Sequence, residues 1–83
     1  MPSIKCRCDE VIHYGEIPCP HEWLLISDVA FSHLSGEVNA EEVYREMTSA
    51  LRCPRCGRLW IFWAGYTGEP AEYVPEELRV SRA

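Results

Sequence analysis

The sequence has few basic residues and no long apolar run, and both absences narrow the classes of protein to which it can belong. Eight Lys and Arg residues stand against thirteen Asp and Glu residues, which leaves a formal net charge of −5 at pH 7. This balance argues against broad, charge-driven binding of DNA or RNA, for which a basic stripe is expected. No apolar run approaches the roughly 20 residues of a membrane span, and residues 1–6 lack the apolar segment of a secretory signal. We therefore expect a cytoplasmic protein that contacts no membrane.

The sequence also lacks the common motifs of catalysis. It contains no Gly-x-Ser-x-Gly element and no Gly-rich phosphate loop. Its three histidines, His13, His21 and His33, are scattered and form no His-x-x-x-His pair. We therefore expect a protein that is not an enzyme.

The length predicts one domain over residues 1–83, with residues 76–83 as a poorly ordered tail. A domain of 83 residues buries only about 60 to 65% of its unfolded surface and often needs a metal, disulfides or a partner for stability. Five cysteines are present, and an odd number without an export signal favours metal ligation over a disulfide framework.

The cysteine spacing predicts where a metal ion is held. Cys53 and Cys56 form a Cys-x-x-Cys pair followed by Gly57, which is typical of a zinc knuckle, a tight turn that presents two cysteines to one ion. Glycine can adopt φ > 0, which allows this turn. One knuckle supplies half of a tetrahedral site. Cys6 and Cys8 are expected to supply the other half, so that one ion ties the N-terminus to the middle of the chain.

Local patterns predict four strands and one helix. The strands are expected at residues 10–14, 23–28, 59–63 and 71–74. The helix is expected to begin after Asn39, its N-cap, with Glu42 as the capping-box partner. It is expected to continue to the second knuckle with an apolar face made of Val43, Met47, Ala50 and Leu51.

A knuckle followed by a β-hairpin resembles a zinc ribbon, in the broad class that includes rubredoxin-like folds. The resemblance covers the first knuckle with the strand after it and residues 53–74, and leaves residues 23–51 as an insertion. It implies a small α+β fold with a three- or four-stranded antiparallel sheet, one helix across that sheet, and a structural zinc ion. The ligands that it implies are Cys6, Cys8, Cys53 and Cys56.

Two alternatives remain open at this metal site. The first pair, Cys6 and Cys8, is one residue shorter than the usual Cys-x-x-Cys, so Cys19 and His21 are alternative ligands, although Pro20 between them makes a shared grip awkward. Four thiolates also hold iron, and rubredoxin-like electron transfer is therefore a third, less favoured function.

Five of the eight basic residues flank the cysteines, namely Lys5, Arg7, Arg52, Arg55 and Arg58. One interpretation is a local nucleic-acid patch that uses Arg52, Arg55 and Arg58. The other is charge compensation, because four thiolates around Zn²⁺ carry a formal charge of about −2. The acidic net charge favours compensation.

The aromatic residues point to a protein partner. In the strand expected at residues 59–63, Trp60 and Phe62 lie on one face, and the helix is expected to cover the other. Unless Trp23 and the Phe31 region pack over them, Trp60 and Phe62 form an exposed patch of the kind found at interfaces. Acidic side chains near the helix, among them Glu41 and Glu46, are expected to steer a basic partner toward this patch.

These observations predict a small zinc-binding protein-interaction module, such as an adaptor, an accessory subunit or an inhibitor of the immunity type. A nucleic-acid-binding zinc ribbon is the alternative function.

Overall fold

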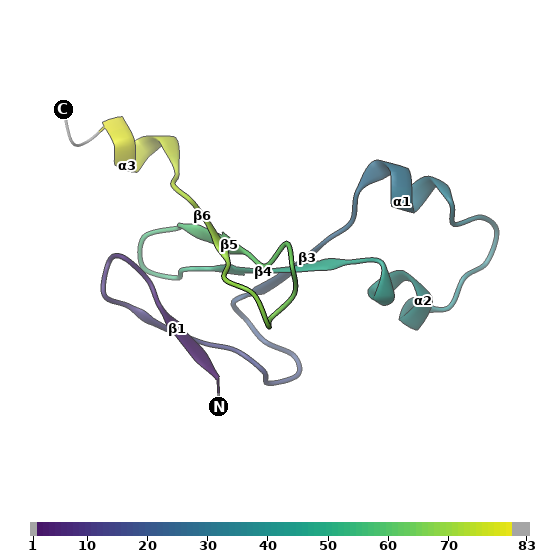
Figure 1. Ribbon diagram of the computed structural model, residues 1–83, viewed down its shortest axis with the longest axis horizontal. Helices are drawn as coiled ribbons and strands as arrows, with labels where there is room; N and C mark the ends of the chain where they lie inside the picture. Colours follow the sequence, from purple (N-terminus) through teal and green to yellow (C-terminus); the bar gives the residue numbers. More distant parts are fainter. Residues whose placement is uncertain (1, 81–83) are drawn as a thin grey trace.

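The computed structural model describes residues 2–80 and contains two antiparallel sheets with three short helices (Figure 1). A two-stranded hairpin is made of β1 (Ser3–Lys5) and β2 (Val11–His13). The larger sheet has the order β3-β4-β5-β6 and consists of β3 (Glu22–Leu25), β4 (Thr48–Arg52), β5 (Leu59–Ile61) and β6 (Ala71–Tyr73). The helices are α1 (Asp28–Ser32), α2 (Ala40–Arg45) and α3 (Glu76–Val80). The prediction of a small α+β fold with a four-stranded antiparallel sheet is confirmed.

The helix expected before the second knuckle is much shorter than predicted. Asn39 is its N-cap, as expected, and the Asn39 side chain accepts a hydrogen bond from the Glu41 backbone N–H at 2.8 Å. The helix ends at Arg45, and Thr48–Arg52 forms the strand β4 instead of two further helical turns. The reason is tertiary: β4 pairs with β3 on one side and with β5 on the other, which outweighs the helical spacing of its apolar residues.

Four other elements differ from the sequence predictions, namely β3, α1, β1 and α3. The strand expected over residues 23–28 ends at Leu25, because Ser27 caps α1 by accepting a hydrogen bond from the Ala30 backbone N–H at 3.0 Å. β1 was not expected, and it exists because it pairs with β2. Part of the expected tail forms α3, and residues 81–83 lie outside the described residues. No helix within residues 2–80 is long and apolar enough to cross a membrane.

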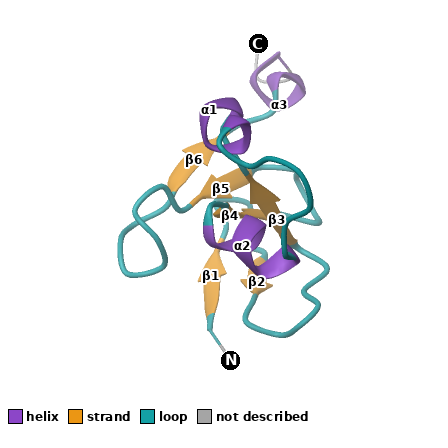
Figure 2. Ribbon diagram, turned by 90° about the vertical axis from the view of Figure 1, so that its right-hand side faces the viewer, coloured by secondary structure: helices purple, strands orange, loops and turns teal. Residues whose placement is uncertain are grey.

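The two faces of the larger sheet have different surroundings. Figures 1 and 2 show the β1–β2 hairpin on one side of this sheet, with α1 and α3 toward the other side and beyond its ends. Neither α1 nor α2 buries a residue, so the expectation that a helix lies across the sheet is wrong. The hairpin takes that place, and it covers one face only.

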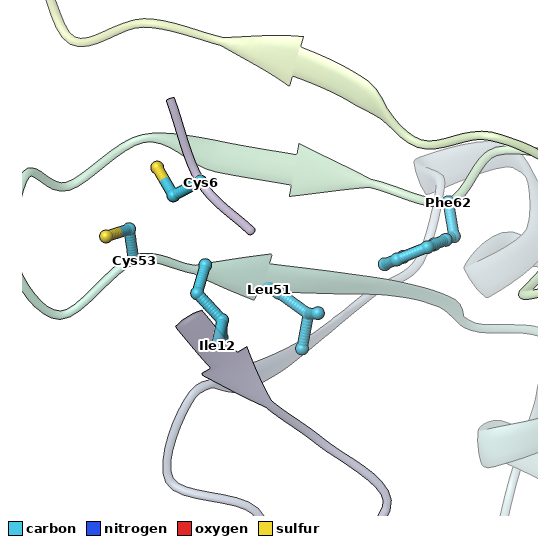
Figure 3. Packing of buried hydrophobic residues seen from close by; sticks show 5 residues of the cluster. All are labelled: Cys6, Ile12, Leu51, Cys53 and Phe62. Atoms are coloured by element: carbon cyan, nitrogen blue, oxygen red, sulfur yellow. The ribbon is translucent and has the colours of Figure 1, made fainter. Parts of the chain in front are cut away.

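The core lies between the hairpin and the sheet. Its buried cluster consists of Cys6, Ile12, Leu51, Cys53 and Phe62 (Figure 3). Two of these five residues are cysteines, so the predicted metal ligands are part of the core itself. A core this small makes the stability of the domain depend on whatever joins the two cysteine loops.

Candidate metal centre

Two loops bring the four predicted cysteine ligands together. Cys6 and Cys8 lie in the loop that joins β1 to β2, and Cys53 and Cys56 lie in the loop that joins β4 to β5. Their four sulfur atoms all lie within 4.8 Å of one another, and the Cys6–Cys56 and Cys8–Cys53 sulfur distances are both 3.5 Å. The four cysteines therefore form one cluster that can hold a metal ion.

The size of the cluster fits a tetrahedral thiolate site. At a metal–sulfur distance of about 2.3 Å, tetrahedral geometry places neighbouring sulfurs about 3.8 Å apart. The measured range, from 3.5 Å to at most 4.8 Å, surrounds this value. Each of the two 3.5 Å contacts joins a cysteine of the β1–β2 loop to a cysteine of the β4–β5 loop. A bound ion would therefore join the hairpin to the sheet.

The shortened first loop is closed in the same manner as the second. Gly57 has φ 84° and its N–H bonds to the carbonyl of Cys53, while Asp9 has φ 77° and its N–H bonds to the carbonyl of Cys6. Aspartate is one of the few residues that adopt this left-handed conformation routinely. Asp9 therefore has the role that glycine has in the second loop, and the missing residue in Cys6-x-Cys8 does not prevent the cysteines from meeting.

A network of three charged side chains supports the Cys56 sulfur. The Arg58 guanidinium donates a hydrogen bond to Cys56 Sγ at 3.3 Å. Its Nε lies 2.9 Å from Glu72 Oε2, and Arg7 Nε donates to Glu72 Oε1 at 2.6 Å. The Arg58 and Glu72 side chains are only 13% and 17% exposed, so Glu72 fixes Arg58 against the sulfur in a partly water-excluded place. The charge compensation expected from the sequence has this specific geometry.

The thiols differ in acidity. Burial raises the pKa of Cys56, but hydrogen bonds from the Arg58 backbone and guanidinium lower it more, to about 6. At Cys8 a hydrogen bond with the Glu10 backbone lowers the pKa, whereas burial and the neighbouring thiols raise it, to about 12. Without metal, Cys56 is therefore the first of the two to become a thiolate, and metal binding must displace a proton from Cys8.

The alternative ligands lie elsewhere. Cys19 is not in the cluster, and its thiol donates a hydrogen bond to the carbonyl of His13 at 3.7 Å. His21 is not in the cluster either, and its backbone carbonyl accepts a hydrogen bond from the Arg52 N–H. The short first cysteine pair therefore needs no substitute ligand.

The two faces of β5 are covered in the opposite way from the prediction. Phe62 is only 3% exposed and lies in the core, and Trp60 packs against the same cluster, so the expectation that they form an exposed patch is wrong. The hairpin covers them, because Leu51, which pairs with Trp60 across the sheet, contacts Ile12 in the core. The uncovered face is the other one, which we call the open face and define by Trp23, Leu25, Ala50, Ile61, Trp63 and Tyr73.

The basic and acidic residues that the sequence suggests as binding residues lie at several separate places. Arg58 is occupied by Cys56 and Glu72, whereas Arg52 and Arg55 are exposed and line a hollow of about 470 Å³ beside the second knuckle. Glu46 is exposed just after α2 and lines a smaller hollow with Trp63, and Glu41 is exposed in the first turn of α2.

Sequence reasoning missed three features of this site. The role of Glu72 has no local signal, because β5–β6 pairing brings Arg58 to it and the packing of the hairpin on the sheet brings Arg7. Asp9 carries a local signal, since an aspartate directly after the second cysteine occupies the place that glycine has in the other loop. The alternation of side chains along β3 and β5 separates the residues of the open face from those of the other face. It does not show which of the two faces is covered.

Comparison with known families places most of the chain in one family model. The model of a domain of unknown function, DUF8617, matches residues 2–77. No curated protein and no solved structure matches the chain.

Proposed function

The chain belongs to the DUF8617 family, and we propose that it is a small zinc-binding protein-interaction module in which the ion is structural. Four thiolates fill the coordination sphere of a tetrahedral zinc ion and leave no position for water or substrate. Two of the four ligands, Cys6 and Cys53, are buried in the core, so the ion would act as part of the core. Zinc in this role fixes the hairpin on the sheet and performs no reaction.

Four thiolates accept either zinc or iron. We propose zinc because the proposed role of the ion is structural. When bound, zinc would attach the hairpin to the larger sheet in addition to their shared hydrophobic core. Elemental analysis of the protein purified from its host decides the metal. We expect one zinc per chain, and iron with a visible charge-transfer band would contradict the proposal.

The open face is the single observation that carries the interaction function. Trp63 is 62% exposed, Trp23 57% and Tyr73 45%, and all three lie on the face of the sheet opposite the hairpin. Exposed tryptophan and tyrosine side chains gathered in one patch are typical of binding surfaces. Glu46, beside Trp63, supplies an acidic group at the rim, which supports a partner with a basic residue at the matching place.

A photocrosslinking experiment in the native host tests this function. Benzoylphenylalanine at position 23 or 63 is expected to yield the same crosslinked protein species, because both positions lie on the open face. The matched control is position 11 in the hairpin, where Val11 is also exposed. Crosslinks of equal yield from position 11, or none from positions 23 and 63, would contradict the proposal. An adaptor, an accessory subunit or an immunity-type inhibitor all predict the same result.

Nucleic-acid binding is the second candidate function, and one observation supports it. Arg52 and Arg55 are exposed and line the hollow beside the second knuckle. Phosphate contacts by these arginines would weaken steeply with salt. Titration of labelled single- and double-stranded nucleic acids at low salt tests this function: binding that is lost in Arg52→Ala and Arg55→Ala supports it, and no binding at low salt rejects it.

A further inference from the structure

The strand register places one apolar row of side chains across the open face. Trp23 lies opposite Ala50, Ala50 opposite Ile61, and Ile61 opposite Ala71, so one row of side chains crosses all four strands. Side chains directly opposite each other in paired strands lie on the same face of the sheet. Ala50 and Ile61 in the middle of this row are buried, whereas Trp23 at its β3 end is more than half exposed. Neighbouring side chains therefore already cover the centre of the row, and the exposed apolar surface comes from the larger side chains around it.

Two further rings stand on this face in a fixed arrangement. The indole N–H of Trp63 donates a hydrogen bond to the Tyr73 hydroxyl at 2.8 Å. This bond links the polar atoms of both side chains to each other and leaves their apolar surfaces toward the outside. Rings that are held in place before binding lose little conformational entropy when a partner covers them.

The area of this surface is large for a domain of this size. At about 200 Å² per aromatic side chain, the exposed parts of Trp23, Trp63 and Tyr73 amount to roughly 330 Å². A stable interface needs about 800 Å² from each partner, and Leu25, which is 37% exposed, adds to the area of the rings. The three rings alone therefore supply roughly 40% of the area of a stable interface.

The charges at the two ends of the face have opposite signs. Glu46 and Trp63 line a hollow of about 210 Å³ at the end nearest α1 and α2. Arg52 is exposed at the other end, where β4 enters the second knuckle. Between these ends, β4 carries only Thr48, Ser49, Ala50 and Leu51. A partner that matches this pattern has an apolar centre, a basic group opposite Glu46 and an acidic group opposite Arg52.

A second copy of the same chain has this pattern when it is turned end for end. We infer that the open face is the interface of a symmetric homodimer, in which the two sheets pack face to face with opposed strand directions. Each Arg52 then lies toward the partner's Glu46, and the two-fold axis makes this pairing twice. The packing of two four-stranded sheets gives a sandwich, which is the usual way in which an uncovered sheet face is buried. The inference rests on the proposed interaction function and names the partner.

Sedimentation equilibrium of the zinc-loaded protein tests the dimer. The wild-type chain is expected to dimerise below about 100 µM, and Trp63→Glu is expected to raise the dissociation constant at least about 30-fold, as for a hot-spot residue. The matched control is Tyr44→Glu, because Tyr44 is similarly exposed at 56% but lies on α2. A wild-type chain that stays monomeric at about 100 µM overturns the inference, as does an equal loss in Tyr44→Glu.

A charge exchange tests the orientation without touching the apolar centre. Glu46→Arg and Arg52→Glu are each expected to weaken the dimer about five-fold at low salt, because each creates two like-charge pairs. The double exchange restores both pairs and should return the affinity to that of the wild type. If the affinity loss of the double variant equals the losses of the two single variants combined, the opposed arrangement is wrong. Zinc content and the crosslinks of the preceding experiment report on the proposed function separately: a crosslink to a different protein supports that function and overturns the dimer.

Discussion

Replacing Glu72 by Gln tests whether the charged network supports the metal site. Glu72 holds Arg58 and Arg7 at 2.9 and 2.6 Å, and Arg58 in turn contacts the Cys56 sulfur. The substitution keeps the volume of the side chain but removes the carboxylate charge. Arg58, whose side chain is only 13% exposed, then loses its anionic partner and keeps only the sulfur.

The expected loss of stability is about 2 kcal/mol, because the substitution leaves the largely buried Arg58 guanidinium without its anionic partner. The exposed Arg7 adds little to this value, because ion pairs of exposed side chains contribute about 0 to 1 kcal/mol. In urea the unfolding midpoint of the zinc-loaded protein should fall by about 1 to 2 M. Zinc affinity, measured by competition with a chromophoric chelator, should fall about 10- to 100-fold, as for other residues that orient a ligand.

Glu69→Gln is the matched control, because Glu69 is an exposed carboxylate in the loop just before β6. It should leave both the urea midpoint and the zinc affinity unchanged. Arg58→Lys should behave like Glu72→Gln, since a lysine ammonium lacks the fork that contacts carboxylate and sulfur together. If Glu72→Gln matches Glu69→Gln in both measurements, the network does not support the metal site and the reasoning is wrong.

Three other substitutions test separate parts of the structure. By elemental analysis, Cys56→Ser should lose the stably bound metal, whereas Cys19→Ser should keep one metal per chain; the reverse result would mean that the ligands are misassigned. Asp9→Val should cost about 1 to 2 kcal/mol in urea unfolding because of the φ of 77°, whereas Asp9→Gly should be tolerated; equal losses in both would reject the turn argument. Burial raises the pKa of Tyr66 to about 12, so its stabilising effect should be fully present below pH 10 and lost between pH 10 and 12. The fall in unfolding free energy over that interval should be smaller in Tyr66→Phe, and an identical fall would refute this cause.

The metal cluster could be predicted from the sequence because its determinants are local. The shape of each loop depends on the spacing of its two cysteines and on the residue with φ > 0 that follows them. Both loops have this shape in the structure. That the two loops meet could be expected as well, since half a tetrahedral site is incomplete alone.

The helix length and the exposed face could not be predicted, because both depend on contacts between distant segments. Ala50 and Leu51 recur at a spacing that suits a helix, but pairing with both β3 and β5 makes β4 the inner strand. Alternation along β5 separates Trp60 from Ile61 correctly, yet only the position of the β1–β2 hairpin decides which of the two faces is covered. Thr48 and Ser49, which are weak helix formers, are the one local sign of the strand.

The division into two sheets has a consequence for the metal-free protein. The hairpin and the larger sheet are separate ladders, and within residues 2–80 no backbone hydrogen bond joins one to the other. A bound ion would be the strongest attachment between them, because the four cysteines come two from each side. Chelation would therefore release the hairpin and expose Leu51, Trp60 and Phe62 on the face that the hairpin had covered. The opposite face of the sheet is the open face. A sheet that is apolar and bare on both faces is a starting point for aggregation, so metal depletion should remove this protein from solution before its strands unfold.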